Sequence, residues 1–122
     1  MSAKKTWNKH ISNPEENPWM DWIASGLKKY EGRIYRDNWS NMKNGDIILF
    51  YNGNKKLYTR VISVKRYQNF KSMFEDLGNN LVPTPNCTAE MVQELYSKIC
   101  GTEKDKNDIK KFGVVAIEIT PL

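Results

Sequence analysis

The stretch that decides the fold reads GLKKYEGR and runs from Gly26 to Arg33. An apolar helical pattern precedes it and a strand-like run follows it, so its charged side chains are predicted at a junction between a helix and a strand. Such junctions lie at the rim of a scaffold, where binding and catalytic groups concentrate. Lys28, Glu31 and Arg33 would offer an ammonium, a carboxylate and a planar fork of donors there. The same spacing is typical of a solvated turn with an ordinary ion pair, and both interpretations stay open.

The residues before the junction predict a short helix. Pro18 suits its first turn, because the missing N–H costs nothing at that position. Apolar residues then recur with helical spacing until Gly26 ends the pattern. This apolar face consists of Trp19, Trp22, Ile23 and Leu27. The two tryptophans are therefore predicted to belong to the core.

Strands are predicted at residues 7–11, 34–39, 47–51, 57–67 and 113–119. The five consecutive apolar residues of 47–51 favour a strand that is buried on both faces. With 57–67 it forms a predicted hairpin, whose loop is longer than two residues. Arg60 and Arg66 share a parity with Ile62 along the second arm, so that arm is predicted to have basic ends and a buried middle.

The second half of the chain predicts two helices and a loop. Residues 70–77 show helical apolar spacing and are followed by Gly78. Thr88 is a predicted N-cap for a helix whose inner face consists of Val92, Leu95, Tyr96 and Ile99. Residues 102–111 mix charges of both signs and contain no aromatic residue, which favours a solvated loop.

Composition narrows the class of protein. At 122 residues the chain predicts one domain, and a net charge of +5 favours a nucleic acid or another polyanion as partner. Cys87, Cys100 and the single histidine, His10, are too few for a zinc site, and no disulfide framework is indicated. We therefore expect free thiols, no metal and no cofactor. Since neither a secretory signal nor a membrane span is recognised, an intracellular, cytoplasmic or nuclear location is expected.

The order of elements predicts an α+β fold, a small closed or nearly closed β-barrel flanked by short helices. Four motifs occur in a specific order within it. They are G-x-K-x-x-E-x-R at Gly26, Lys28, Glu31 and Arg33; Gly45-Asp46-Ile47-Ile48; Tyr67 followed by the helix of 70–77; and the strand that begins at Gly113. In this order the chain resembles the ASCH family, the activating-signal-cointegrator homology domains of the PUA-like superfamily.

The resemblance covers residues 12–119 and implies one PUA-like domain over 1–122, with about five to six strands and a cleft beside the barrel. Family members resemble modules that bind or process RNA, some of them tied to transcription coactivation or translation. Small bacterial relatives are amidohydrolases of acetylated cytidine nucleosides that use Lys, Thr and Glu. The lysine corresponds to Lys28, Glu31 occupies the threonine position, and the glutamate falls near Glu75. A carboxylate beside Lys28 favours a protonated amine, which is a poorer base.

The first hypothesis is a module that holds RNA, or a nucleotide-like ligand, in the cleft. The expected ligand-binding residues are Lys28, Lys29, Tyr30, Glu31, Arg33, Trp39, Arg60, Lys65, Arg66 and Tyr67. Basic side chains among them would take phosphate or a base edge, Glu31 would orient them or accept from an exocyclic amine, and aromatic rings would stack on a base.

Two other hypotheses stay open. An enzyme acting on modified nucleosides or on RNA would use Lys28, Glu31 and Glu75 as catalytic residues, and it predicts a lowered pKa of Lys28. A protein-interaction module would leave the cleft vestigial. RNA is the expected partner in the first case, protein partners are expected in the third, and the chain is expected to be a monomer.

Overall fold

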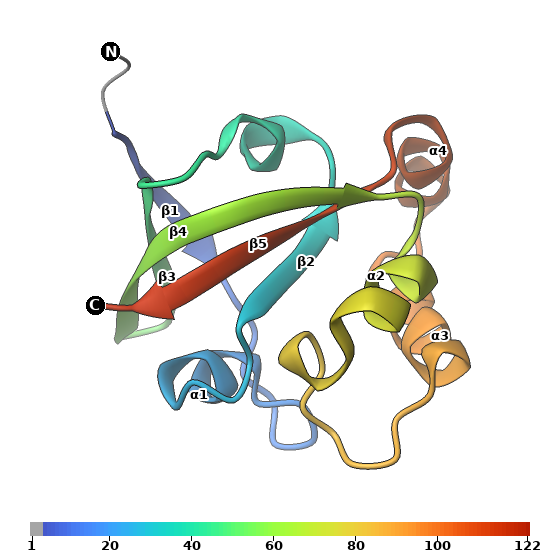
Figure 1. Ribbon diagram of the computed structural model, residues 1–122, viewed down its shortest axis with the longest axis horizontal. Coiled ribbons are helices and arrows are strands. Elements are labelled where there is room, and N and C mark those ends of the chain that lie inside the picture. The colour runs from blue at the N-terminus through green and yellow to red at the C-terminus, as the bar shows by residue number, and fades with distance from the viewer. Residues whose placement is uncertain (1–3) are drawn as a thin grey trace.

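The computed structural model describes residues 4–122 as a curled sheet with four α-helices around it (Figure 1). Its strands are β1 (Thr6–His10), β2 (Tyr30–Ile34), β3 (Ile47–Asn52), β4 (Lys55–Tyr67) and β5 (Val114–Pro121). Its α-helices are α1 (Trp19–Ala24), α2 (Phe70–Leu77), α3 (Ala89–Ile99) and α4 (Glu103–Phe112), and its 3₁₀ segments are η1 (Asp37–Asn41) and η2 (Gly78–Asn80). The predicted α+β class is confirmed.

The sheet has the strand order β1-β3-β4-β5-β2, so β1 and β2 are its edges. β1 pairs with β3 in parallel, and the other neighbours are antiparallel. The sheet curls into a half-barrel, and α2, α3 and α4 gather at one side of it while α1 lies at another end (Figure 1). The predicted nearly closed barrel is therefore confirmed as an open half-barrel, with two edge strands left unpaired along one side.

A continuous apolar core joins the sheet to its helices. Ile48, Phe50, Val61 and Ile117 are fully buried, and Tyr96 of α3 stacks on Phe70 of α2 with ring centroids 4.1 Å apart. Burial of such side chains stabilises the fold by roughly 1.5–3 kcal/mol each. The core thus fixes α3 against α2, which matters below because α3 forms one wall of the cleft.

Helix α1 forms where the sequence predicts it but is shorter. Trp19 and Ile23 are buried as predicted, whereas Leu27 is 58% exposed and lies beyond the helix. Gly26 has a φ of +84°, a left-handed conformation that glycine adopts without strain, and it turns the chain from α1 towards β2. This turn places Lys28 inside the molecule rather than on a solvated loop.

The prediction of a strand at residues 34–39 is wrong. The strand is β2, which pairs with β5 from Tyr30 to Ile34, so the charged residues of the junction lie within the sheet. After it the chain turns through Asp37, whose φ is +54°, into η1, where Trp39 is buried. Pairing with β5, which lies far away in sequence, overrides the local pattern.

Two details of the predicted hairpin are also wrong. β3 alternates between buried and solvent-facing residues, with Phe50 fully buried and Tyr51 40% exposed, because only one face of this sheet is covered. The loop between β3 and β4 consists of two residues, Gly53 and Asn54, since pairing extends to Asn52 and Lys55. The strands are longer than their apolar runs.

The predicted parity of β4 is reversed. Thr59 and Val61 are buried, whereas Arg60 and Ile62 face solvent, and Ile62 is 40% exposed. The register shifts between Val61 and Ser63, so one extra residue interrupts the alternation. Basic and apolar residues therefore share the outer face of this strand.

The loop predicted at residues 102–111 is in fact α4. Thr102 accepts a hydrogen bond from the backbone of Asp105, and Asp105 accepts one from the backbone of Thr102, which is a capping box. Acidic residues occupy its first turn and Lys110 and Lys111 its last, as the helix dipole favours. The predicted N-cap Thr88 and stop Gly78 are confirmed, but Ile99 at the end of α3 is 55% exposed rather than core.

Three further observations bear on function. Cys87 and Cys100 are free thiols. Residues 4–122 contain no group of three or more His, Cys, Asp or Glu side chains placed to hold a metal ion. Within the same residues, every helix is too short or too polar to cross a membrane.

Candidate functional site

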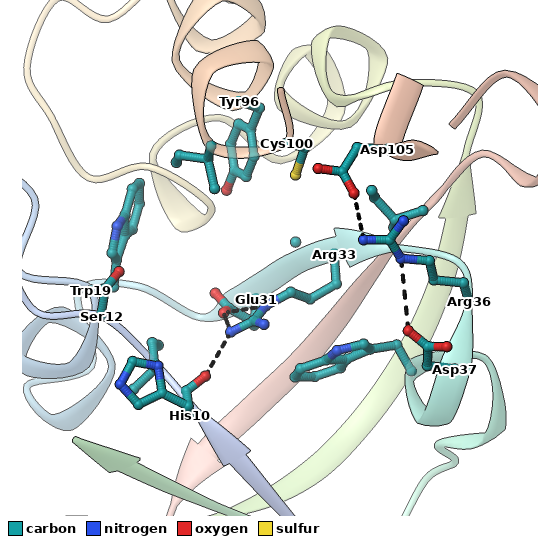
Figure 2. Close-up of a pocket in the computed structure, with 15 residues that line it drawn as sticks. His10, Ser12, Trp19, Glu31, Arg33, Arg36, Asp37, Tyr96, Cys100 and Asp105 are labelled. Carbon is teal, nitrogen blue, oxygen red and sulfur yellow. Dashed lines mark hydrogen bonds and ion pairs between the residues drawn. The ribbon is translucent and has the colours of Figure 1, made fainter. Parts of the chain in front are cut away.

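A cleft of about 430 Å³ opens between the two edge strands, where the half-barrel does not close. Its polar walls come from β1, β2, the start of η1 and α4, and consist of His10, Glu31, Arg33, Arg36, Asp37 and Asp105. Figure 2 shows Tyr96, Cys100 and Asp105 along one side of the cavity and Glu31, Arg33 and His10 opposite them. The volume lies within the range of small-molecule sites.

Lys28 lies behind this cleft rather than in its lining. Its side chain is fully buried, and its Nζ donates a hydrogen bond to the Leu81 carbonyl at 2.6 Å. The same Nζ is 3.6 Å from Glu31 Oε1 and 5.1 Å from the centroid of the Trp19 ring. Burial lowers the pKa of Lys28 to about 8, although Glu31 opposes this shift.

Glu31 joins Lys28 to the cleft. It is 6% exposed, and its Oε2 accepts a hydrogen bond from Arg33 Nε at 2.9 Å and pairs with Arg33 Nη2 at 2.8 Å. Arg33 Nη2 also donates to the His10 carbonyl at 3.2 Å, which bridges the two edge strands. The Arg33 guanidinium lies 4.5 Å from the centroid of the Trp39 ring. We call Lys28, Glu31 and Arg33 the Glu31 network.

A second ion network forms the opposite end of the cleft. Arg36 donates to Asp105 Oδ1 at 2.6 Å and to Asp108 Oδ2 at 2.8 Å, and both carboxylates belong to α4. Lys104 Nζ reaches the same oxygen of Asp108 at 2.8 Å. Hydrogen bonds to Asp108 and Asp105 raise the pKa of Arg36, and the hydrogen bond from Arg36 lowers the pKa of Asp105. We call Arg36, Asp105, Asp108 and Lys104 the Arg36 clamp.

Two groups at the cleft retain hydrogen-bonding capacity. No described residue accepts from Arg33 Nη1, and none forms a hydrogen bond with the Tyr96 hydroxyl. Burial raises the pKa of Tyr96, so this hydroxyl keeps its proton at neutral pH. Together with the Glu31 carboxylate, the cleft offers donors, an acceptor and a hydroxyl that can act as either.

The structure brings together three of the residues that the sequence singles out, namely Glu31, Arg33 and Trp39, around one cleft, with Lys28 directly behind them. The others lie elsewhere. Lys29 is exposed, and Tyr30 is half-buried beside Glu118. Tyr67 donates to Asp76, and Glu75 is exposed on α2. Arg60, Lys65 and Arg66 are exposed on β4.

Sequence reasoning missed several polar residues of the cleft. The sequence pattern predicts Tyr96 on the inner face of a helix, considers His10 only as a metal ligand, and gives Arg36, Asp37 and Asp105 no role. A signal for Asp105 exists in the sequence, since Thr102 followed three residues later by an acid is a capping pattern that begins a helix. Arg36 depends on that helix, because its carboxylate partners lie about 70 residues further along the chain.

The family model described as the ASCH domain matches residues 16–122. The chain belongs to the ASCH domain family. The expected family is therefore confirmed, and the Glu31 network consists of the three charged residues in the G-x-K-x-x-E-x-R stretch of this sequence.

Solved structures resemble this ASCH domain over nearly its whole length. The hypothetical protein PH0355 is 35% identical with a TM-score of 0.78, covering 96% of this chain and 99% of that chain. Protein PF0455 from Pyrococcus furiosus is 34% identical with a TM-score of 0.73, covering 96% and 97%. The ASCH domain from Lactobacillus crispatus JV V101 is 16% identical with a TM-score of 0.63, covering 97% of this chain and 79% of that chain. At this identity the match shows the shared fold. No curated protein sequence matches the chain significantly.

Proposed function

We propose that this ASCH domain binds RNA by holding one nucleotide of a single strand in the cleft beside β2. The observation that carries the proposal is the arginine of the Glu31 network. A buried carboxylate holds the Arg33 guanidinium over the Trp39 ring, and its Nη1 remains free for a ligand. A planar guanidinium held in this way can stack on a base and donate to its edge.

The charges of the cleft favour a base over a phosphate. Two arginines line it together with three carboxylates, those of Glu31, Asp37 and Asp105, and both arginines are already paired. A phosphate would have to displace one of these carboxylates and would meet the others. An uncharged base finds instead the free donors of Arg33 and Tyr96 and the acceptor oxygens of Glu31, which suit an edge with both carbonyl and amino groups.

Lys28 takes a positioning role in this proposal. Its fully buried ammonium holds Glu31 from behind, and Leu81 and Trp19 enclose it. It does not reach the ligand. Residues that contact a ligand are positioned best when other residues support them from behind. Lys28 therefore fixes the orientation of Glu31, and Glu31 fixes that of Arg33.

The test is a titration of the purified domain with short single-stranded RNA, duplex RNA and free cytidine nucleotides at two salt concentrations. Arg33→Gln is expected to weaken single-strand binding at least tenfold, on the order of one lost charged hydrogen bond and one lost stacking plane. Tyr96→Phe removes only a hydroxyl and keeps the stacking on Phe70, and a loss of about three- to tenfold is expected.

Tyr58→Phe is the matched control, since Tyr58 is 50% exposed on β4 and does not line the cleft. Urea unfolding of each variant confirms that the fold is intact. Binding that is equal in all variants, or absent from every RNA, would contradict the proposal.

A second candidate function rests on the lowered pKa of Lys28, since an amine with a pKa of about 8 is partly neutral at physiological pH. A hydrolase of acetylated nucleosides would use it as a base with Glu31 or Glu75. Lys28 is 1% exposed, however, and Glu75 lies outside the cleft lining. Incubation with an acetylated cytidine nucleoside separates the two functions. Turnover that Lys28→Met abolishes, with the fold retained, would make the enzyme the better account.

A further inference from the structure

A second cleft adjoins the first one on the far side of Arg36. Its volume is about 440 Å³, and Arg36 and Asp37 line both cavities, so they form the wall between them. The remaining lining comes from the ends of β2 and α4 and from η1, and includes Tyr35, Lys104 and Phe112. None of the RNA-binding residues predicted from the sequence lines this cavity, although Arg66 lies beside it.

The second cleft presents aromatic surface. Tyr35 is half-buried, and the guanidinium of Arg66 lies 3.7 Å from the centroid of its ring. Arg66 Nη2 also donates to the Phe112 carbonyl at 2.6 Å, which fixes the last turn of α4 against β4. Phe112 is 39% exposed. Aromatic rings held beside a fixed guanidinium are the usual platform for a nucleic-acid base, whatever its identity.

The charges around the second cleft differ from those of the first. Lys104 is 77% exposed at its side chain, Arg66 is exposed, and the Nζ of Lys111 lies 5.3 Å from the Phe112 ring. Asp37 and Asp108 also line this cleft, and Lys104 pairs with Asp108 at 2.8 Å, but the three cations are exposed to solvent and belong to no buried ion pair. A phosphate can therefore approach this rim without displacing a buried ion pair.

From this arrangement we propose that the second cleft binds the nucleotide next to the one in the first cleft, with its base against Tyr35 and Phe112 and the connecting phosphate near Lys104. The inference rests on the proposed function and narrows its ligand to an oligonucleotide of at least two residues. A free nucleoside fills only the first cleft. The wall that Arg36 forms separates the two bases, and two hydrogen bonds from Arg36 tie this wall to α4.

The experiment compares affinities for cytidine and adenosine mononucleotides, dinucleotides and tetranucleotides. The unmodified domain is expected to bind dinucleotides at least about fivefold more tightly than mononucleotides, the low end of what one stacked base contributes. Tyr35→Leu, which keeps an apolar side chain at that position, is expected to remove most of this gain. Mononucleotide affinity should stay unchanged in this variant, because Tyr35 does not line the first cleft.

Lys104→Gln and Lys98→Gln form a matched pair. Each lysine pairs with a carboxylate four residues earlier or later on its own helix, and each is exposed, but only Lys104 lines the second cleft. Lys104→Gln should reduce the dependence of log affinity on log salt by about 0.7 for one lost phosphate contact, whereas Lys98→Gln should not.

The outcomes are distinguishable. If dinucleotides bind no more tightly than mononucleotides, or if Lys104→Gln and Lys98→Gln have equal effects, the proposed role of the second cleft is wrong. The proposed role of the first cleft would still stand if mononucleotide affinity depends on Arg33. Failure of all nucleotides to bind would overturn the proposed function and this inference together.

Discussion

The Glu31 network and the Arg36 clamp both contain an arginine linked through a carboxylate to a lysine. In the first, Arg33 pairs with Glu31, which pairs with Lys28, and in the second, Arg36 pairs with Asp108, which pairs with Lys104. Their arginines are similarly exposed, at 31% and 28% of the side chain. The lysines differ, because that of the first network is 0% exposed and that of the second is 77% exposed.

This difference decides what each network can do. A lysine without water loses hydration that its partners only partly replace, so the pKa of Lys28 falls and its removal leaves charges unpaired inside the protein. A lysine in water contributes little to stability, yet it remains available to a ligand. We infer that burial of one lysine turns a common charge triad into a rigid support, and that exposure of the other makes it a recognition surface.

The largest expected effect comes from Glu31→Gln. The change leaves the buried ammonium of Lys28 without its carboxylate, and we expect a loss of about 3 kcal/mol in the free energy of unfolding. Urea denaturation at pH 7 measures it. Glu94→Gln is the control, since Glu94 pairs with Lys98 on the surface of α3. Equal losses in both variants would remove the contrast between buried and exposed networks.

The next effect is a pH dependence of stability that belongs to Lys28. Its folded pKa of about 8 lies below the ordinary value of 10.5, so between these values the unfolded chain holds a proton that the folded chain has released. Stability therefore rises with pH across this window. We expect the free energy of unfolding to rise by about 1–2 kcal/mol between pH 7.5 and 9.5, because a tenfold difference in proton affinity corresponds to about 1.4 kcal/mol.

Comparison with Lys28→Met isolates this effect, because both proteins share the same tyrosines and cysteines. Urea denaturation at several pH values should show the rise in the unmodified chain and not in the variant. Parallel pH profiles would mean that Lys28 keeps an ordinary pKa and that the two lysines do not differ.

Breaking the Arg36 clamp should cost less. Arg36→Met is expected to reduce the free energy of unfolding by about 1 kcal/mol at low salt, because the clamp is partly exposed and solvent screens it. The loss should shrink as salt is raised to about 0.5 M, where the screening length is below about 5 Å. The loss caused by Glu31→Gln should persist at the same salt. If the loss of stability caused by Arg36→Met does not depend on salt, the Arg36 clamp is shielded from solvent like the Glu31 network, and the contrast between them is wrong.

The smallest effect is expected for Lys104→Gln. This lysine lies in water, and its replacement should leave the urea midpoint unchanged within error. Its effect should be confined to RNA affinity, as described for the second cleft. A clear loss of stability would show that Lys104 supports α4, and it would reduce the contrast with Lys28 to one of degree.

Local pattern is sufficient to predict those parts of the fold that local chemistry determines. The helical spacing before Gly26, the N-cap at Thr88 and the apolar strand that follows Gly113 all form as the sequence predicts. The motif residues Glu31 and Arg33 do come together at a cleft. Each of these features depends on residues that are close in sequence or on a family pattern.

The misses share a different cause, which is pairing over long sequence distances. The local pattern predicts Trp39 in a strand because nothing nearby shows that β5 pairs only up to Ile34. The second wall of the cleft needs α4, and mixed charges hide that helix despite its capping pattern at Thr102. The burial of Lys28 depends on the Leu81 carbonyl, 53 residues away, and no spacing rule reveals such a partner.

Strand β1 belongs to the cleft although it lies outside the part of the chain that matches the family. The stretch by which the family is recognised starts at residue 16, whereas the strand that supplies Lys9 to Trp39 and the His10 carbonyl to Arg33 lies wholly before it. A chain trimmed to residues 16–122 would keep every family motif and lose the wall of the cleft that residues 10–12 form. The part of the chain that carries the family motifs is thus shorter than the part that forms the whole cleft.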